Sequence, residues 1–166
     1  MAKPKYMTTD LSDAHEGAEE GYLRYLTPNY QDFGGRKRFH GQVKTLVTYE
    51  DNTKLRAAVE QPGAGRVLVV DGGGSMNCAL FGGNLAKLAA DNSWAGVIIH
   101  GCVRDCAELA AEAVGIKALA AHPKKSLKRD LGTYDVALKF SGVTINPGDW
   151  IYADEDGVLI ADRQLG

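Results

Sequence analysis

The chain has 166 residues, of which 45% are hydrophobic and 24% are charged, and its formal net charge is −2 at pH 7. This length and balance predict one globular domain over residues 1–166. The net charge provides no basic field for direct nucleic-acid binding, and no apolar run is long enough to span a bilayer, so we expect neither a nucleic-acid-binding protein nor a membrane protein.

The N-terminal segment, MAKPKYMTTDLSDAHEG, lacks the apolar stretch of a secretion signal. The three cysteines, Cys78, Cys102 and Cys106, form an odd set without a CxxC pair, which is typical of a reduced protein rather than of a disulfide framework. We therefore expect a cytoplasmic location.

The first third of the chain predicts a short helix within 8–17 and then a loop over 23–39, which proline and glycine residues interrupt. Alternating apolar residues over 40–51 indicate a half-buried strand. Helical spacing over 52–61 indicates a helix that Pro62 ends.

The middle of the chain alternates buried strands with helices. Continuous apolar runs at 66–71, 94–101 and 116–122 indicate strands that are covered on both faces. Segments 84–93 and 105–115 have helical spacing and lie between these strands. The middle of the chain is therefore predicted to form a strand–helix–strand–helix–strand unit.

The C-terminal segment, 135–162, has alternating apolar residues with turns at Pro147–Gly148 and Asp156–Gly157, which indicates a β-meander. Together with the middle of the chain, this pattern predicts an α/β fold with an added β layer.

Glycine clusters supply the first candidate site. The stretch DGGGSMN follows a strand but lacks the glycine spacing of a dinucleotide fingerprint and the Gly-Lys-Ser/Thr ending of a P-loop. In FGGNLAKLA, the glycines Gly82 and Gly83 precede a helix, and a helix start of this kind favours a carboxylate or phosphate. The alternative interpretation is a turn with Asn84 as an ordinary N-cap.

Arg104 and Asp105 follow the strand that ends near His100. In α/β sheets ligands bind outside the carboxyl ends of strands, so this position favours a site. Arg104 is able to hold a carboxylate with two hydrogen bonds, and Asp105 to supply one oxygen to a magnesium-type ion. The alternative is a solvated pair that contributes less than about 1 kcal/mol. His100 and His122 are expected to be structural, with His122 kept as an alternative proton shuttle.

If both loops lie at one sheet edge, the amides, the guanidinium and a metal converge on one small anion. A 2-oxo acid fits, because its carboxylate suits the amides and Arg104, while a metal stabilises the enolate as a Lewis acid.

The stretch RVLVVDGGGSMNCALFGGNLAKLAADNSWAGVIIHGCVRD, followed by GIKALAAHP, GVTINPGD and YADEDGVLI, resembles the RraA-like family. That family includes class II 4-hydroxy-4-methyl-2-oxoglutarate aldolases and the regulator of ribonuclease activity A. The resemblance implies a β/β/α swivelling-domain-like fold and a homotrimer with sites near subunit interfaces.

The implied activity is divalent-metal-dependent (Mg²⁺ or Mn²⁺) retro-aldol cleavage to pyruvate, with oxaloacetate decarboxylation through the same enolate. By the same resemblance, Arg104 and Asp105 are the catalytic pair, with Asp105 binding the metal and Glu108 lying close behind. The implied substrate-binding residues are Gly82, Gly83, Asn84, Leu85 and Arg104.

One departure separates the chain from the aldolase members, which carry an aspartate at the position of Gly83. The regulator members, in contrast, need no metal-binding aspartate, whereas this chain has Asp105. Two functions therefore stand as hypotheses: a metal-dependent lyase acting on 2-oxo acids, and a non-catalytic regulator that binds ribonuclease E or another RNA-processing protein.

Overall fold

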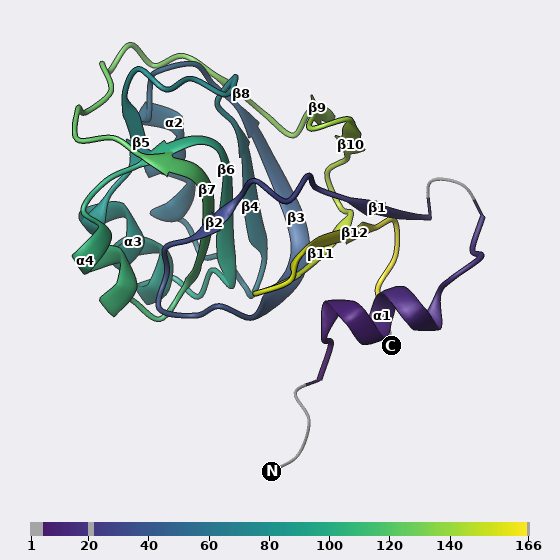
Figure 1. Ribbon diagram of the computed structural model, residues 1–166. Helices are drawn as coiled ribbons and strands as arrows, with labels where there is room; N and C mark the ends of the chain where they lie inside the picture. Colours follow the sequence, from purple (N-terminus) through teal and green to yellow (C-terminus); the bar gives the residue numbers. More distant parts are fainter. Residues whose placement is uncertain (1–4, 20–21, 166) are drawn as a thin grey trace.

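The computed structural model describes residues 5–19 and 22–165 (Figure 1). The described helices are α1 (Thr8–Ala14), α2 (Thr53–Val59), α3 (Gly83–Asp91) and α4 (Cys106–Ala111). The described strands are β1 (Leu23–Tyr25), β2 (Gln31–Asp32), β3 (Phe39–Val47), β4 (Val67–Asp71), β5 (Ala79–Phe81), β6 (Gly96–Val103), β7 (Gly115–Ala121), β8 (Thr133–Tyr134), β9 (Leu138–Phe140), β10 (Val143–Ile145), β11 (Trp150–Asp154) and β12 (Gly157–Ala161).

One large mixed sheet organises the molecule, with the strand order β1-β12-β11-β3-β4-β6-β7-β2. Its centre, β3-β4-β6-β7, is parallel, and β5 pairs in parallel with the end of β6. Helices α2, α3 and α4 lie together on one side of the sheet, whereas β9 and β10 lie on the other (Figure 1). The layers are therefore β, β and α, as expected for the fold class.

The continuous apolar run at the start of β4 is explained by burial on both faces. Leu68 and Val70 pack in the core between the sheet and the helices. Val67 and Val69 point the other way, into a second core that includes residues of β9, β10 and β11. All four side chains are fully buried, so this strand has no polar face.

The N-terminal helix α1 packs at the opposite end of the sheet, against β11 and β12 (Figure 1). Thr8 donates from its amide and its hydroxyl to the buried carboxylate of Asp154, at 2.8 and 2.7 Å. No described helix is long and apolar enough to cross a membrane.

Two expectations from the sequence need correction. The segment expected as a loop over 23–39 contains β1 and β2, which pair with the distant strands β12 and β7. The C-terminal strands form two separate hairpins, β9–β10 and β11–β12, rather than one continuous meander. Both features depend on which strands meet in space, and local spacing does not carry that information.

Candidate active site

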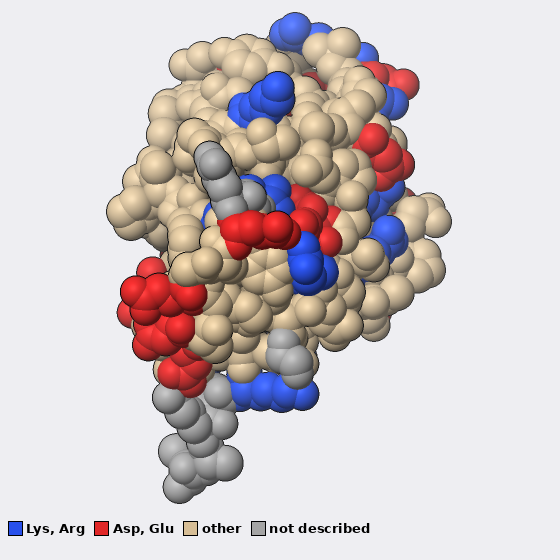
Figure 2. Space-filling view, turned by 90° about the vertical axis from the view of Figure 1, so that its right-hand side faces the viewer, with Lys and Arg blue, Asp and Glu red and all other residues tan. Residues whose placement is uncertain are grey.

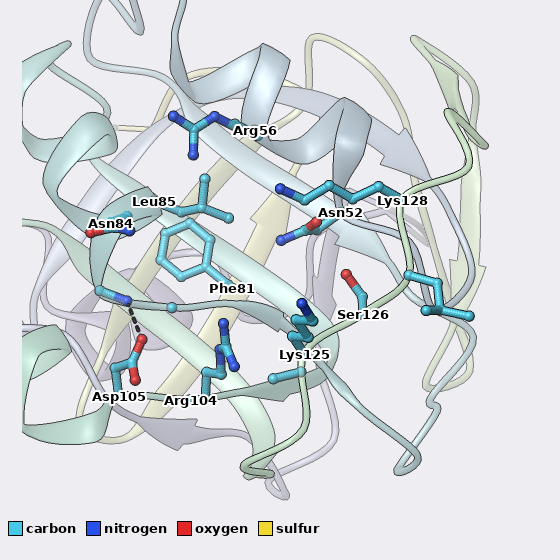
Figure 3. A pocket seen from close by; sticks show the side chains of 14 residues that line it. Asn52, Arg56, Phe81, Asn84, Leu85, Arg104, Asp105, Lys125, Ser126 and Lys128 are labelled. Atoms are coloured by element: carbon cyan, nitrogen blue, oxygen red, sulfur yellow. Dashed lines mark hydrogen bonds between the residues drawn. The ribbon is translucent and has the colours of Figure 1, made fainter.

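A pocket of about 420 Å³ opens where the parallel strands β5 and β6 end (Figure 3). Helix α3 begins directly after β5, and Arg104 and Asp105 come directly after β6, which extends past His100 to Val103. The two loops that the sequence singled out therefore meet at one sheet edge, and Gly82, Gly83, Asn84, Leu85, Arg104 and Asp105 all line the pocket.

Arg104 and Asp105 do not form a solvated pair with each other. Among the described residues no ion pair includes either side chain. Among the described residues, the Arg104 guanidinium makes one long hydrogen bond, of 3.5 Å, from Nη1 to the carbonyl oxygen of Pro123. The guanidinium is half-buried on the pocket wall and keeps most of its donors for a ligand.

Asp105 has a left-handed backbone conformation, with φ 62° and ψ 47°. Such a conformation costs a non-glycine residue about 1–3 kcal/mol, although aspartate tolerates it better than most. The carboxylate does not cap α4; its Oδ2 atom accepts a hydrogen bond of 3.0 Å from the amide of Gly83. The strained backbone thus turns the carboxylate toward the start of α3 (Figure 3).

The two glycines at the start of α3 leave space that neighbouring side chains use. A Cβ atom on Gly82 would lie 2.7 Å from Asp105 Oδ2 and 3.3 Å from Arg104 Cγ. A Cβ atom on Gly83 would overlap the Glu108 carboxylate. The Glu108 carboxylate of α4 therefore occupies the space that a side chain at position 83 would take.

The start of α3 also presents free backbone donors. The first intrahelical acceptor is the carbonyl of Gly82, which receives the amide of Ala86. No described group accepts a hydrogen bond from the amides of Asn84 and Leu85. Both residues line the pocket, and the N-cap is Gly82, not Asn84 as the alternative interpretation held.

The other wall of the pocket comes from residues that sequence reasoning did not assign to the site: Asn52, Arg56, Ala79, Phe81, Lys125, Ser126, Leu127 and Lys128. Four of them belong to the basic loop 123–132. The density of cations in PKKSLKRD is the sequence signal that could have indicated this part of the site. Only the fold brings the loop to the pocket that Arg104 lines.

The buried carboxylate of Asp51 fixes this loop. Asp51 Oδ2 accepts hydrogen bonds from the amides of Arg129 (2.5 Å) and Leu131 (3.3 Å), and Oδ1 from the amide and hydroxyl of Thr53. Burial raises the pKa of Asp51, but these hydrogen bonds outweigh it and the net pKa is lowered. The loop is therefore held in place by an ionised, fully paired carboxylate.

The residues present fit a divalent cation that keeps most of its water ligands. Asp105 has one carboxylate oxygen, Oδ1, without a hydrogen-bond partner among the described residues, and Glu108 brings a second carboxylate close by. No cluster of three or more His, Cys, Asp or Glu side chains is present in the described residues. The described residues therefore contain no metal site made of protein ligands alone. Magnesium does not need such a site, because it typically takes one or two carboxylates and completes its shell with water and substrate.

The two histidines considered from the sequence lie elsewhere. His100 stacks on Phe140 on the far side of the sheet and shares a hydrogen bond of 2.7 Å with the Tyr30 hydroxyl. His122 is not a pocket residue, and its Nδ1 accepts a hydrogen bond from the amide of Lys124. Of the carboxylates and imidazoles near the pocket, Asp105 and Glu108 are the ones the fold brings to the helix start.

The chain is similar to known proteins along nearly its whole length. A family model described as RraA-like, Aldolase/RraA, matches residues 8–160. A protein of Alkalilimnicola ehrlichii, provisionally named 4-hydroxy-4-methyl-2-oxoglutarate aldolase, is 56% identical over 95% of this chain and 96% of its own.

Two solved structures are similar along nearly the whole chain. The RNA-processing inhibitor RraA from Thermus thermophilis superposes with a TM-score of 0.91 and 47% identity, over 100% of this chain and 96% of that one. A Geobacillus kaustophilus protein, named S-adenosylmethionine: 2-dimethylmenaquinone methyltransferase, has a TM-score of 0.88 and 43% identity, over 96% of each chain.

Proposed function

Because the chain belongs to the RraA-like family, we propose that it is a divalent-metal-dependent lyase that cleaves 4-hydroxy-4-methyl-2-oxoglutarate to pyruvate. As the C3–C4 bond breaks, the 4-hydroxyl group gives its proton to water and C4 becomes the 2-oxo carbon of one pyruvate. The other half is left as an enolate, which takes up a proton to become the second pyruvate. Decarboxylation of oxaloacetate yields the same enolate and is proposed as a secondary activity.

The substrate carboxylate is assigned to Arg104 and the start of α3. The half-buried guanidinium has donors to spare, and the amides of Asn84 and Leu85 have no acceptor among the described residues. Two backbone donors beside a forked cation match the two oxygens of a carboxylate. Gly82 and Gly83 contribute by letting these groups approach closely.

The metal is assigned to Asp105, as Mg²⁺ or Mn²⁺. When bound there, the cation acts as a Lewis acid on the 2-oxo oxygen of the substrate. The hydrogen bond from the Gly83 amide orients the Asp105 carboxylate and leaves its second oxygen available. Asp105 thus couples the metal position to the helix start that holds the substrate.

Proton transfer is assigned to the neighbourhood of Glu108. The carboxylate that aldolase members carry at position 83 is missing here, but the Glu108 carboxylate lies in that space. We assign it the role of holding a water beside the reacting carbon. On this proposal the chain keeps the carboxylate that aldolase members carry at position 83, but supplies it from Glu108 on α4.

The single observation that carries the proposal is the joint orientation of Arg104 and Asp105 into one pocket at the start of α3. The test is pyruvate release from 4-hydroxy-4-methyl-2-oxoglutarate and from oxaloacetate, with Mg²⁺ or Mn²⁺ and then with excess EDTA. Arg104→Ala and Asp105→Ala are each expected to lower turnover by about a hundredfold or more. Lys139→Ala, an exposed change on β9, serves as the control and should leave the rate unchanged. Absence of metal-dependent release with both substrates would reject the lyase.

The methyltransferase name of one structural relative finds no support in the pocket. Four cationic side chains line it, Arg56, Arg104, Lys125 and Lys128. The sulfonium centre of S-adenosylmethionine is itself a cation, so this lining disfavours it. The same lining favours a polyanionic acid.

A second candidate function, regulation of an RNA-processing protein without chemistry, is supported by the Thermus relative described as an RNA-processing inhibitor. Asp13, Glu16 and Glu19 line an open hollow next to α1, and Figure 2 shows acidic side chains gathered on that side of the molecule. A basic segment of a ribonuclease E-type partner is the matching surface. Binding of such a segment that weakens on replacing Asp13 and Glu16 by Ala, with lyase activity absent, would favour this candidate.

A further inference from the structure

The wall of the pocket that faces away from Asp105 contains polar groups with no assigned task. Asn52 and Arg56 come from the start of α2, and Ser126 and Lys128 come from the basic loop. Figure 3 shows Arg56, Asn52 and Lys128 beyond Phe81 and Leu85 as seen from Asp105. The apolar pair thus separates two polar ends of one pocket.

Two buried atoms on this wall lack a hydrogen-bond partner. They are Ser126 Oγ and Asn52 Oδ1, and Ser126 is only 5% exposed. The described residues contain four such atoms in all, and the remaining two, on Arg24 and Asp32, lie outside the pocket. Leaving a buried polar group unpaired is costly, so a hydroxyl and an amide oxygen at the wall of one pocket point to a ligand that pairs with them.

The two lysines of this wall have no anionic partner among the described residues. No described carboxylate forms an ion pair with Lys125 or Lys128. Arg56 pairs with Glu60 on its own helix, at 3.3 Å, with both side chains about half exposed. A single carboxylate held at Arg104 would leave Lys125 and Lys128 without a partner, whereas a second anionic group would reach this wall.

The loop that carries Ser126 and Lys128 is already in position. The hydrogen bonds from Arg129 and Leu131 to Asp51 fix its second half, and the amide of Ala79 donates to the carbonyl of Lys124 at its start. A ligand therefore need not order this segment, and preorganisation of this kind favours binding.

We infer that Asn52, Arg56, Ser126 and Lys128 form a distal subsite that binds a second carboxylate of the substrate and selects dicarboxylic over monocarboxylic 2-oxo acids. Lys128, Arg56 and the Ser126 hydroxyl donate to that carboxylate. Asn52 Oδ1 accepts a hydrogen bond from a hydroxyl group on the carbon next to it. The inference rests on the proposed function, since it takes Arg104 as the binding group for the first carboxylate.

The test compares two acids with the same five-carbon chain, 2-oxoglutarate and 2-oxovalerate, by isothermal titration calorimetry in the presence of Mg²⁺. They differ in the distal carboxylate alone. The wild-type protein is expected to bind 2-oxoglutarate more tightly, by about tenfold or more, because charge-assisted hydrogen bonds are made to one acid and not to the other.

The variants Ser126→Ala and Lys128→Met are each expected to weaken 2-oxoglutarate binding by about tenfold. Binding of 2-oxovalerate should stay within about twofold, which also reports an intact pocket. The matched control is Lys139→Met, which removes an exposed lysine on β9 and should change neither affinity.

The distal subsite would be overturned if the wild-type protein bound the two acids equally, or if the variants weakened binding of both acids equally. Metal-dependent pyruvate release would still uphold the lyase in that case. A preference for 2-oxoglutarate that Lys128→Met removes, in a protein that releases no pyruvate, would uphold the subsite and reject the lyase. Failure to bind either acid would reject the subsite.

Discussion

At the scale of single residues, the site depends on side chains that are missing as much as on those present. Gly82 lets the Asp105 carboxylate come close to α3, and Gly83 leaves room for the Glu108 carboxylate. Both acidic groups come from the segment after β6, and both reach a helix that follows a different strand. A methyl group added at Gly82 or Gly83 would therefore affect the reaction by displacing the carboxylate of Asp105 or of Glu108.

We predict that Gly82→Ala lowers turnover by roughly tenfold to a hundredfold, because the new methyl group displaces Asp105 Oδ2 and such small misplacements are costly in catalysis. The measurement is kcat for pyruvate release, along with the melting temperature. Gly101→Ala is the matched control, since a Cβ atom there meets nothing closer than 3.4 Å. Equal activity in the two variants would show that the close approach at Gly82 is not needed.

At the scale of elements, the basic loop and the start of α2 act as one unit through Asp51. Its carboxylate accepts hydrogen bonds from both segments, and Thr48 donates its hydroxyl to the Asp51 carbonyl. Lys128 and Ser126 thus owe their position to a buried acid that does not touch the pocket.

We predict that Asp51→Asn lowers the free energy of unfolding by about 1–3 kcal/mol at pH 7, because the charge-assisted hydrogen bonds are lost. Since the folded-state pKa of Asp51 is lowered, its contribution is present above the unfolded value of about 3.9 and is lost as pH falls through the lower folded value. Urea unfolding from pH 7 to pH 3 should therefore show the two proteins converging in acid.

The matched control for this prediction is Asp135→Asn, which changes an exposed aspartate paired with Lys44 at 3.2 Å. Exposed ion pairs contribute less than about 1 kcal/mol, so this variant should remain close to the wild-type protein at every pH. A constant difference between Asp51→Asn and the wild-type protein across the whole pH range would contradict the assigned role of the charge.

At the scale of the whole molecule, large apolar side chains remain exposed around the pocket end of the sheet. Tyr49 and Val47 lie at or beyond the end of β3, and Leu127 and Leu131 belong to the basic loop. Exposed apolar residues that gather in this way are typical of a surface that another protein covers. We propose the homotrimer implied by the family as the assembly that covers it.

We predict that light scattering after size-exclusion chromatography gives a mass three times that of the 17.8 kDa chain. Replacing Tyr49 and Leu127 by Glu should lower this mass, because charge on a buried contact surface disfavours association. The same replacement of the exposed Tyr25, which lies at the other end of the molecule on β1, should leave the measured mass unchanged. A monomeric wild-type protein would contradict the proposal.

The sequence was sufficient where local signals and one topological rule agree. The apolar runs predicted β4, β6 and β7, and the rule that ligands bind at the carboxyl ends of strands favoured a site at Arg104, which includes the start of α3 if both loops lie at one sheet edge. It was insufficient where distant segments meet. The pairing of β1 with β12, the approach of Glu108 to Gly83 and the position of Lys128 all depend on packing that residue spacing does not encode.

We propose that the Arg104–Asp105 pocket forms the enolate of pyruvate and protonates it. The most direct measurement is exchange of the pyruvate methyl protons with D₂O, followed by proton NMR with Mg²⁺ and with EDTA. We predict exchange that requires the metal and falls by about a hundredfold or more in Arg104→Ala and Asp105→Asn. Exchange no faster than in buffer, or equal rates in the wild-type protein and both variants, would contradict the claim.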